Sequence, residues 1–499
     1  MTLTEGAPAS ASAVEHVDVC IVGAGISGIG AAHHLLEQCP GRTFTILESM
    51  GTFGGTWVTH HYPGARSDSD LYTMGYRFKP WTGPPIATAG EILGYLGEVV
   101  ADDGLDRAIR YHHTVTAAAW SSDERCWTLE VSRTDTSEQL RLTCGFLWMC
   151  QGYYRHAEPF TPAWPGLERF EGTVVHPQRW PDDLDLSGKR VVVIGSGATA
   201  ATLIPAIAAE AEHVTMLQRS PTFFITGANR NETAEMLRGL EVPEEWTYEI
   251  VRRQMIQYLE LLAEMSRDAP ELTREELLKP IRELLGEEYD VDTHFSPRYR
   301  PWQQRIAYVP DGDLFQAISS GKASVVTDEI ESFTEDSIVL RSGATLEPDV
   351  VITATGFNMS VLGDIAFTVD DAPIEFASTV AYRGMMFTGV PNLVWVFGYF
   401  RFSWTLRVDL LGDFVCRLLN HMDELGARVV VPQLRPDEAS MPRLPWVDPE
   451  NFNPGYVTRS LHLMPFQGDR DPWRHTQDFA VDKRELPEAD LDDGALAYK

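Results

Sequence analysis

The fold of this chain is decided near its N-terminus by the stretch Val17-Asp18-Val19-Cys20-Ile21-Val22-Gly23-Ala24-Gly25-Ile26-Ser27-Gly28. The first six residues form a short, mostly apolar run, which is typical of a strand inside a parallel sheet. A Gly-x-Gly-x-x-Gly turn follows directly, and the residues after it predict a helix over 31–38. A second strand is expected over 44–47, ending at Glu48. Together these features predict a βαβ unit that holds a dinucleotide.

The same unit recurs in the second third of the chain. A strand over 191–194 leads into Gly195-Ser196-Gly197-Ala198-Thr199-Ala200, in which alanine replaces the third glycine. A helix over 199–210 and a strand over 213–217 follow, and that strand ends in Gln218-Arg219-Ser220. Two such units predict two nucleotides held face to face, as electron transfer from a nicotinamide to a flavin requires.

The residues that close the two units differ in charge and predict different nucleotides. A carboxylate at Glu48 accepts hydrogen bonds from a ribose and repels a 2′-phosphate, so FAD or NAD fits the first unit. A guanidinium at Arg219 pairs with a 2′-phosphate, so the second unit is predicted to take NADPH; a surface arginine without a ligand is the alternative. The predicted nucleotide contacts are Gly23, Gly25, Ser27, Gly28, Glu48, Gly195, Gly197, Ala198, Thr199, Ala200, Arg219 and Ser220.

Two further loops carry less specific signals. In Gly54-Gly55-Thr56-Trp57 the glycine pair allows close approach of the backbone to a ring or phosphate, and the indole offers a flat apolar face. These residues alone do not decide whether this loop contacts the cofactor, so both interpretations stay open. The further predicted cofactor contacts are Gly55, Thr56, Trp57, Arg66, Asp68 and Val115.

Composition narrows the class of protein. With 499 residues the chain is long enough for two or three domains. The net charge of −31 argues against a nucleic-acid partner and an anionic membrane surface, because Lys and Arg clusters are lacking. The six cysteines and the adjacent histidine pairs lack metal-ligand spacing, so we expect no metal site. Without an apolar run that could span a bilayer or a signal sequence, the protein is expected to be cytoplasmic.

The predicted fold is α/β, with two Rossmann-like dinucleotide-binding domains. A disordered tail is expected over 1–15, and the first part of the FAD-binding domain over 16–158. The NADP-binding domain is expected over 159–344, inserted into a discontinuous FAD domain that resumes over 345–499 and ends in a C-terminal wrap. The apolar run 350–353 is taken as the strand that brings the chain back to the first nucleotide. A helical insertion is expected over 228–300, where Trp246, Ile250, Tyr258 and Leu262 recur at near-helical spacing.

A third element lies just ahead of the second glycine turn, Phe170-x-Gly172-x-x-x-His176-x-x-x-Trp180-Pro181-Asp182. With the two turns, it resembles the fingerprint of the class B flavoprotein monooxygenases, specifically the type I Baeyer–Villiger monooxygenases. The related N- and S-oxygenating enzymes typically have Tyr or Phe at the position of Trp180. Further stretches resemble the actinobacterial, ethionamide-activating subgroup: Arg66-Ser67-Asp68-Ser69-Asp70-Leu71-Tyr72, Leu217-Gln218-Arg219-Ser220-Pro221-Thr222 and Gly455-Tyr456-Val457.

The resemblance implies an enzyme that contains FAD and uses NADPH and O2. Such an enzyme inserts one oxygen atom beside a ketone carbonyl to give an ester or lactone, and it also oxygenates sulfides. The resemblance assigns the catalytic cation to Arg305 and its acidic partner to Asp68. Because the reaction needs no histidine as a general base, we expect His176 to be a hydrogen-bonding hinge between the domains. By analogy Trp404 lines the substrate pocket, and core packing is the alternative.

Other functions remain open on the sequence. An S- or N-oxygenating flavin monooxygenase without Baeyer–Villiger activity is the nearest alternative. A flavin disulfide reductase shares the two-nucleotide architecture but requires a redox-active cysteine pair, which the cysteine spacing does not supply. The hypothesis of a non-enzymatic FAD-binding protein does not explain why the chain has a second glycine turn. The identity of the ketone or sulfide and the oligomeric state are not predicted.

Overall fold

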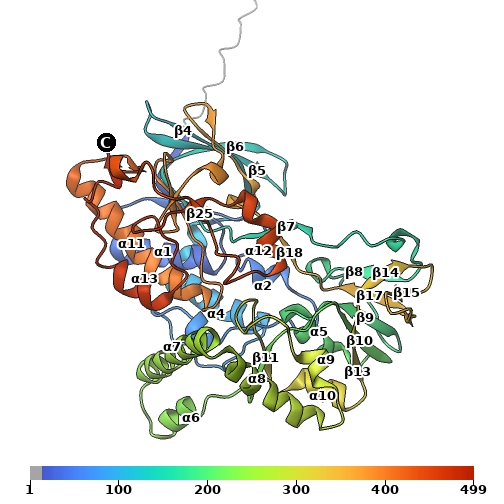
Figure 1. Ribbon diagram of the computed structural model, residues 1–499. Helices are drawn as coiled ribbons and strands as arrows, with labels where there is room; N and C mark the ends of the chain where they lie inside the picture. Colours follow the sequence, from blue (N-terminus) through green and yellow to red (C-terminus); the bar gives the residue numbers. More distant parts are fainter. Residues whose placement is uncertain (1–13) are drawn as a thin grey trace, which may run out of the picture.

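The computed structural model describes residues 14–499 (Figure 1). Most of the predicted tail, residues 1–13, therefore lies outside the described residues. Glu15 was assigned to that tail, and this is wrong: it is the first residue of strand β1 (Glu15–Val22). The strand extends two residues beyond the apolar run because Glu15 and His16 pair with the neighbouring strand β6, which the local pattern cannot show.

The first sheet is mixed, with the order β20-β19-β4-β5-β6-β1-β2-β3, and β23 pairs with β6. Strand β1 lies between β2 and β6 and is parallel to both, and the buried residues of its second half explain its apolar sequence. The other strands of this sheet are β2 (Phe44–Leu47), β3 (Ile109–Arg110), β4 (His113–Ser121), β5 (Cys126–Arg133), β6 (Gln139–Met149), β19 (Ala366–Val369), β20 (Ala372–Pro373) and β23 (Leu393–Trp395).

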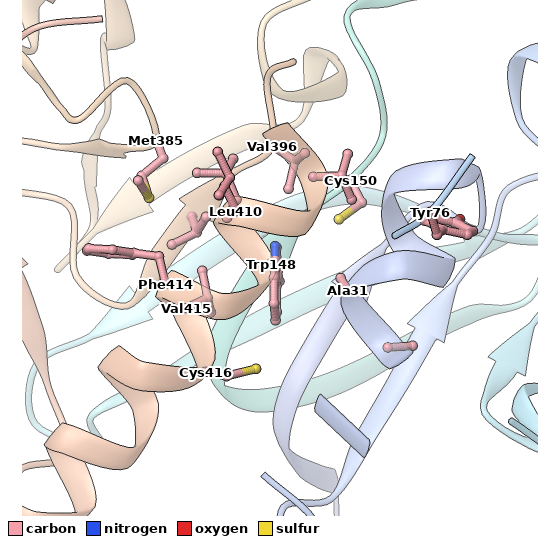
Figure 2. Close-up of a cluster of buried hydrophobic side chains, with 14 of the residues drawn as sticks. Ala31, Tyr76, Trp148, Cys150, Met385, Val396, Leu410, Phe414, Val415 and Cys416 are labelled. Atoms are coloured by element: carbon pink, nitrogen blue, oxygen red, sulfur yellow. The ribbon is translucent and has the colours of Figure 1, made fainter. Parts of the chain in front are cut away.

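Helices α1 (Ile26–Gln38) and α11 (Trp404–Leu425) lie side by side in the core of this domain (Figures 1 and 2). Figure 2 shows Ala31 of α1 and Val415 of α11 in the same buried cluster as Trp148 of β6. The two helices approach closely at Gly412, where an added Cβ would lie 2.3 Å from Cδ2 of His34. This packing joins α1, which follows the N-terminal glycine turn, to a helix that begins only at Trp404. The first domain is therefore built from two distant parts of the chain.

The second sheet is parallel throughout its described pairings, with the order β13-β10-β9-β17-β8. Its strands are β8 (Thr173–Val175), β9 (Arg190–Ile194), β10 (His213–Gln218), β13 (Ala323–Thr327) and β17 (Val350–Thr353). Helices α5 (Ala198–Ile207) and α10 (Asp313–Ser319) pack against it.

The predicted boundary at residue 345 is wrong for strand β17. This strand was assigned to the returning FAD domain, but it pairs with β8 and β9 in the second sheet. An apolar run of four residues predicts a buried strand without predicting its partner, which only long-range pairing decides. We therefore propose that the second domain extends to Thr353.

Two connecting segments carry the chain between the sheets and lie against each other. Strand β7 (Tyr154–Pro159) follows the first sheet, and β18 (Phe357–Met359) follows β17; the two pair antiparallel.

The other helices and strands outside the helical insertion are α2 (Thr56–Thr59), α3 (Leu71–Met74), α4 (Ala89–Asp102), β11 (Phe224–Gly227), β12 (Ala307–Pro310), β14 (Ile330–Phe333), β15 (Ile338–Leu340), β16 (Thr345–Leu346), β21 (Ala381–Tyr382), β22 (Met386–Phe387), β24 (Val430–Pro432), β25 (Leu444–Pro445), α12 (Gly455–Ser460), β26 (Phe466–Gln467), α13 (Phe479–Glu485) and β27 (Leu496–Tyr498).

Residues 228–300 are largely helical, as the spacing predicts, with α6 (Glu232–Gly239), α7 (Glu244–Asp268), α8 (Pro270–Leu285) and α9 (Val291–Phe295). The apolar stripe read from the sequence coincides only in part with the buried face of α7, because Leu262 alone of its four named residues is buried. Trp246, Ile250 and Tyr258 are exposed, whereas Tyr248 and Val251 are buried. The buried face is chosen by contacts with the first domain, where the hydroxyl of Tyr248 donates to the Tyr76 carbonyl at 2.9 Å.

A buried arginine fixes α7 to the first domain. The guanidinium of Arg252 donates to the carbonyls of Tyr72, Thr73 and Gly75 at 2.7–3.1 Å and lies 3.4 Å from the carboxylate of Asp409 on α11. Both charged side chains are at most 6% exposed. The pair therefore stabilises the docking of the helical insertion only while both partners are present.

We expect the Arg252→Met variant to lose about 3–5 kcal/mol of unfolding free energy, because Asp409 is then left buried without this cation. Urea denaturation of the purified protein measures the loss. The matched control is Arg253→Met, which removes the neighbouring arginine; it is exposed and pairs with Glu249 at 2.6 Å. That control is expected to change stability by less than about 1 kcal/mol. Equal stability of the two variants would contradict the assignment.

Candidate functional site

One continuous cavity of about 1070 Å³ lies between the two sheets. It is lined by both glycine turns, by the loop that carries α2, by the segment around Arg305 and by residues of α12. Figure 1 shows α2, α5 and α12 around the junction of the two domains. The cavity is therefore shared between the domains, which places the two predicted nucleotide sites in one space.

The first glycine turn leads into the N-terminus of α1. The N-cap residue of this helix is Gly25, whose lack of a side chain leaves the first-turn amides uncapped and open to an anion. Glu48 is 4% exposed, and its carboxylate accepts hydrogen bonds from the backbone amides of Ala24 and Met50, both at 2.8 Å. This carboxylate thus stands at the turn and lines the cavity, where it can accept further bonds from a ribose.

The second glycine turn repeats this geometry at α5. Its N-cap residue is Gly197, again without a side-chain cap. A Cβ added there would meet no protein atom within 4 Å and would project into open space. Arg219 is exposed and lines the cavity beside this turn. The arrangement supplies free amides and a guanidinium to a phosphorylated nucleotide.

The predicted contact residues are brought together with two exceptions. The cavity is lined by Gly23, Gly25, Ser27, Glu48, Gly55, Thr56, Trp57, Arg66, Asp68, Val115, Gly195, Gly197, Ala198, Thr199, Arg219, Ser220 and Arg305. Gly28 and Ala200 do not line it, and their role as contacts stays a prediction. A Cβ on Gly28 would lie 1.9 Å from the Gly23 carbonyl oxygen, and Ala200 is fully buried. Both positions need a small residue for helix–strand packing, which the same motif also requires.

The predicted catalytic pair is formed across the cavity. One guanidinium nitrogen of Arg305 lies 3.3 and 3.2 Å from the two carboxylate oxygens of Asp68. The side chains are 32% and 21% exposed. The Asp68 carboxylate raises the pKa of Arg305 well above its usual range, so this cation is fixed and permanent. Their positions are 237 residues apart in the chain, and only the tertiary fold joins them.

Comparison with known proteins identifies the family. Residues 17–247 match the family described as pyridine nucleotide-disulphide oxidoreductase. The chain is 46% identical over 486 residues to the FAD-containing monooxygenase EthA of Mycobacterium tuberculosis, covering 97% of this chain and 98% of that protein. The chain belongs to the FAD-containing monooxygenases.

Solved structures of flavin monooxygenases share this fold. Oxidized steroid monooxygenase bound to NADP matches with a TM-score of 0.76 and 24% identity, covering 97% of this chain and 99% of that one. Cyclohexanone monooxygenase bound to ε-caprolactone matches with a TM-score of 0.74 and 21% identity, covering 97% and 100%. The predicted α/β architecture with two nucleotide-binding domains is therefore confirmed for this monooxygenase.

Arg66 lines the cavity, but its charge is already paired. Its guanidinium forms a two-point contact with Asp313 of α10, at 2.6 and 3.0 Å. Because Arg66 belongs to the first domain and Asp313 to the second, this pair joins the two domains. Its predicted role as a cofactor contact therefore competes with a role in domain docking.

The Phe170–Asp182 element lies along the connecting segments. The Nδ1 of His176 accepts a hydrogen bond from the Gln178 amide at 3.1 Å, and the Gln178 side chain donates to backbone carbonyls of β7. The carbonyl of Trp180 lies 3.0 Å from Nε2 of His61 in the first domain. The contacts to β7 and His61 come from Gln178 and Trp180, while the Nε2 of His176 has no partner in the described chain, so the hinge role of His176 stays a prediction.

Aromatic residues form a wall of the cavity, and the sequence analysis singled out only some of them. Trp404 belongs to this wall: its Nε1 donates to Ser27 Oγ at 2.8 Å, and its ring stacks on Tyr153 with centroids 5.2 Å apart. The cavity-lining rings beyond Trp57 and Trp404 include Tyr153, Tyr154, Phe357, Phe402 and Tyr456. The sequence analysis predicted Trp57 as a contact, left Trp404 open and quoted Tyr456 in a stretch shared with the subgroup. It did not predict Tyr153, Tyr154, Phe357 and Phe402.

The cysteines do not support disulfide chemistry at this site. All six lie in the described chain and are free and buried, and among them Cys150 alone lines the cavity. A reductase needs two thiols there. Within residues 14–499, no group of His, Cys, Asp and Glu side chains is arranged to hold a metal ion. No described helix is long and apolar enough to cross a membrane.

Proposed function

We propose that this monooxygenase binds FAD at the first glycine turn and NADPH at the second. We further propose that it inserts one atom of O2 beside a ketone carbonyl to give an ester or lactone, and that it also oxygenates sulfides. The observation that carries the proposal is the Arg305–Asp68 pair inside a cavity shared by both turns. Cyclohexanone and ε-caprolactone, named for one similar structure, differ by one such inserted oxygen atom.

The residues of this chain fit both cofactors. The uncapped starts of α1 and α5 suit two pyrophosphates, Glu48 suits a free ribose, and Arg219 suits a 2′-phosphate. When bound, the flavin takes up electrons from NADPH and transfers oxygen to the substrate.

Arg305 supplies the charge that this chemistry needs from the protein. A guanidinium stays protonated when water is excluded, and Asp68 holds it in one orientation. Negative charge that develops on oxygen during the reaction is stabilised by such a fixed cation. The aromatic wall around Tyr153 and Trp404 lowers the access of water to this point.

A product screen tests the proposal. Purified holoenzyme is incubated with NADPH, ¹⁸O2 and a panel of linear, cyclic and aryl ketones and aryl sulfides, and products are identified by mass spectrometry. Esters or lactones that carry one ¹⁸O atom are expected. Sulfoxides without any ester would instead assign the S-oxygenating alternative, and protein without flavin would contradict the cofactor assignment.

We expect Arg219→Ala to raise the KM for NADPH by about tenfold or more, since a charge-assisted contact contributes roughly 1.5–3 kcal/mol. The KM for NADH should change little, because NADH lacks the 2′-phosphate. Steady-state kinetics with both coenzymes measure the ratio. Arg282→Ala is the control, because this arginine of α8 pairs with Glu275 and Asp292 away from the cavity. An unchanged NADPH/NADH ratio would refute the phosphate assignment.

A further inference from the structure

The hydroxyl of Tyr456 is a polar group at the cavity to which the proposed function assigns no role. It is buried, and within residues 14–499 it has no hydrogen-bond partner. Tyr456 nevertheless lines the cavity, on the short helix α12. A buried donor without a partner is uncommon in native proteins and points to a partner that arrives with a ligand.

The rings around Tyr456 hold it in one place. Its centroid lies 6.4 Å from that of Tyr153 and 6.3 Å from that of Tyr154. The hydroxyl of Tyr153 donates to that of Tyr154 at 2.7 Å, so each of these two phenols has a hydrogen-bond partner. Of the three hydroxyls, that of Tyr456 is the one without a partner in the described chain, and a ligand can supply that partner.

The same side chain lies in the field of the catalytic cation. Burial raises the pKa of Tyr456, and the Arg305 guanidinium opposes that increase. The phenol therefore stays protonated at neutral pH and remains a donor. A neutral donor and a permanent cation face the same part of the cavity, which is the arrangement that stabilises a developing oxyanion.

We propose that Tyr456 donates a hydrogen bond to the carbonyl oxygen of the ketone substrate, next to Arg305, and is a catalytic residue for carbonyl substrates. This inference rests on the proposed function. The carbonyl oxygen gains negative charge when its carbon is attacked, and a donor that is already in place stabilises that charge. A sulfide has no such oxygen, so the sulfur reaction does not use this hydrogen bond.

The experiment is a competition in one reaction mixture. Holoenzyme, NADPH and O2 are supplied with acetophenone and methyl phenyl sulfide, two compounds of matched shape, and phenyl acetate and sulfoxide are quantified. In Tyr456→Phe we expect the ester-to-sulfoxide ratio to fall about 10²-fold, as for the loss of one oxyanion donor. The matched control is Tyr382→Phe, because the Tyr382 hydroxyl is also buried without a partner but lies in the core and not at the cavity. That control should leave the ratio unchanged.

A spectroscopic measurement tests the same bond without turnover. The carbonyl stretch of ¹³C-labelled acetophenone bound to the oxidised holoenzyme should lie at lower frequency in the wild type than in Tyr456→Phe. An unchanged ratio together with an unchanged frequency would overturn the inference. A parallel fall of both products with a higher KM for NADPH would also overturn it and assign the hydroxyl to the nucleotide. Absence of ester from the wild type would instead refute the proposed function, while the frequency shift would still test the hydrogen bond.

Discussion

The Arg305→Ala variant is expected to form oxygenated product at least about 10²–10³-fold more slowly than the wild type, because one preorganised charge at the reacting oxygen is lost. The loss should persist at saturating substrate, since the missing interaction acts on the reaction and not on substrate binding. Product formation measured by mass spectrometry, beside NADPH consumption, gives the result. NADPH oxidation should continue and become uncoupled from ester formation.

Two variants control this experiment. Asp68→Asn keeps the cation but removes the charge that orients it, so a smaller decrease is expected than for the loss of Arg305 itself. Arg141→Ala removes an exposed arginine that pairs with Glu130 on the first sheet, and its activity should match the wild type. Ester formation at the wild-type rate without Arg305 would remove this residue from the mechanism.

The Gly28→Ala variant is expected to lose about 3 kcal/mol or more of unfolding free energy. Its Cβ would lie 1.9 Å from the Gly23 carbonyl oxygen, so the turn and α1 have to separate. The same shift moves the amides at the start of α1 away from the first nucleotide site, so the purified variant should also retain less FAD. Urea denaturation and the flavin-to-protein absorbance ratio measure the two effects.

Gly90→Ala is the matched control for that variant. Gly90 lies in α4, and an added Cβ would meet no atom within 4 Å. Because alanine favours a helix over glycine by about 1 kcal/mol, this control should be as stable as the wild type or more stable. A Gly28→Ala protein that unfolds at wild-type urea concentrations and keeps its flavin would show that the turn adapts without cost.

Local signals in the sequence were sufficient for the two nucleotide-binding units. In each unit the strand, the glycine turn and the closing residue, Glu48 or Arg219, lie within about 30 residues of each other, and a βαβ unit is built from contiguous chain. The turns lead into α1 and α5 as predicted. The helices begin earlier than the apolar pattern alone suggests, at Ile26 in the first unit, because the turn itself supplies their first residues.

Other features were misassigned because their partners are distant in the sequence. The apolar run of β17 predicted a strand but not its place beside β9. The near-helical stripe of α7 predicted a helix, but Trp246, Ile250 and Tyr258 of that stripe are exposed, since the buried face is built around the polar contacts of Arg252 and Tyr248 with the first domain. Periodicity reports what a segment can bury, and the neighbouring segment decides what it does bury.

The sequence alone predicted two dinucleotide-binding units, the first closed by the acidic Glu48 and the second by the basic Arg219. It could do so because each unit is defined by residues that are neighbours along the chain. The resemblance to a known family added the identity of Arg305 and Asp68. The tertiary structure alone decided that both glycine turns open into one cavity, that the guanidinium of Arg305 contacts Asp68, and that the free hydroxyl of Tyr456 lies beside them. These residues come from five distant segments, and their distances follow from domain packing, which no local pattern encodes.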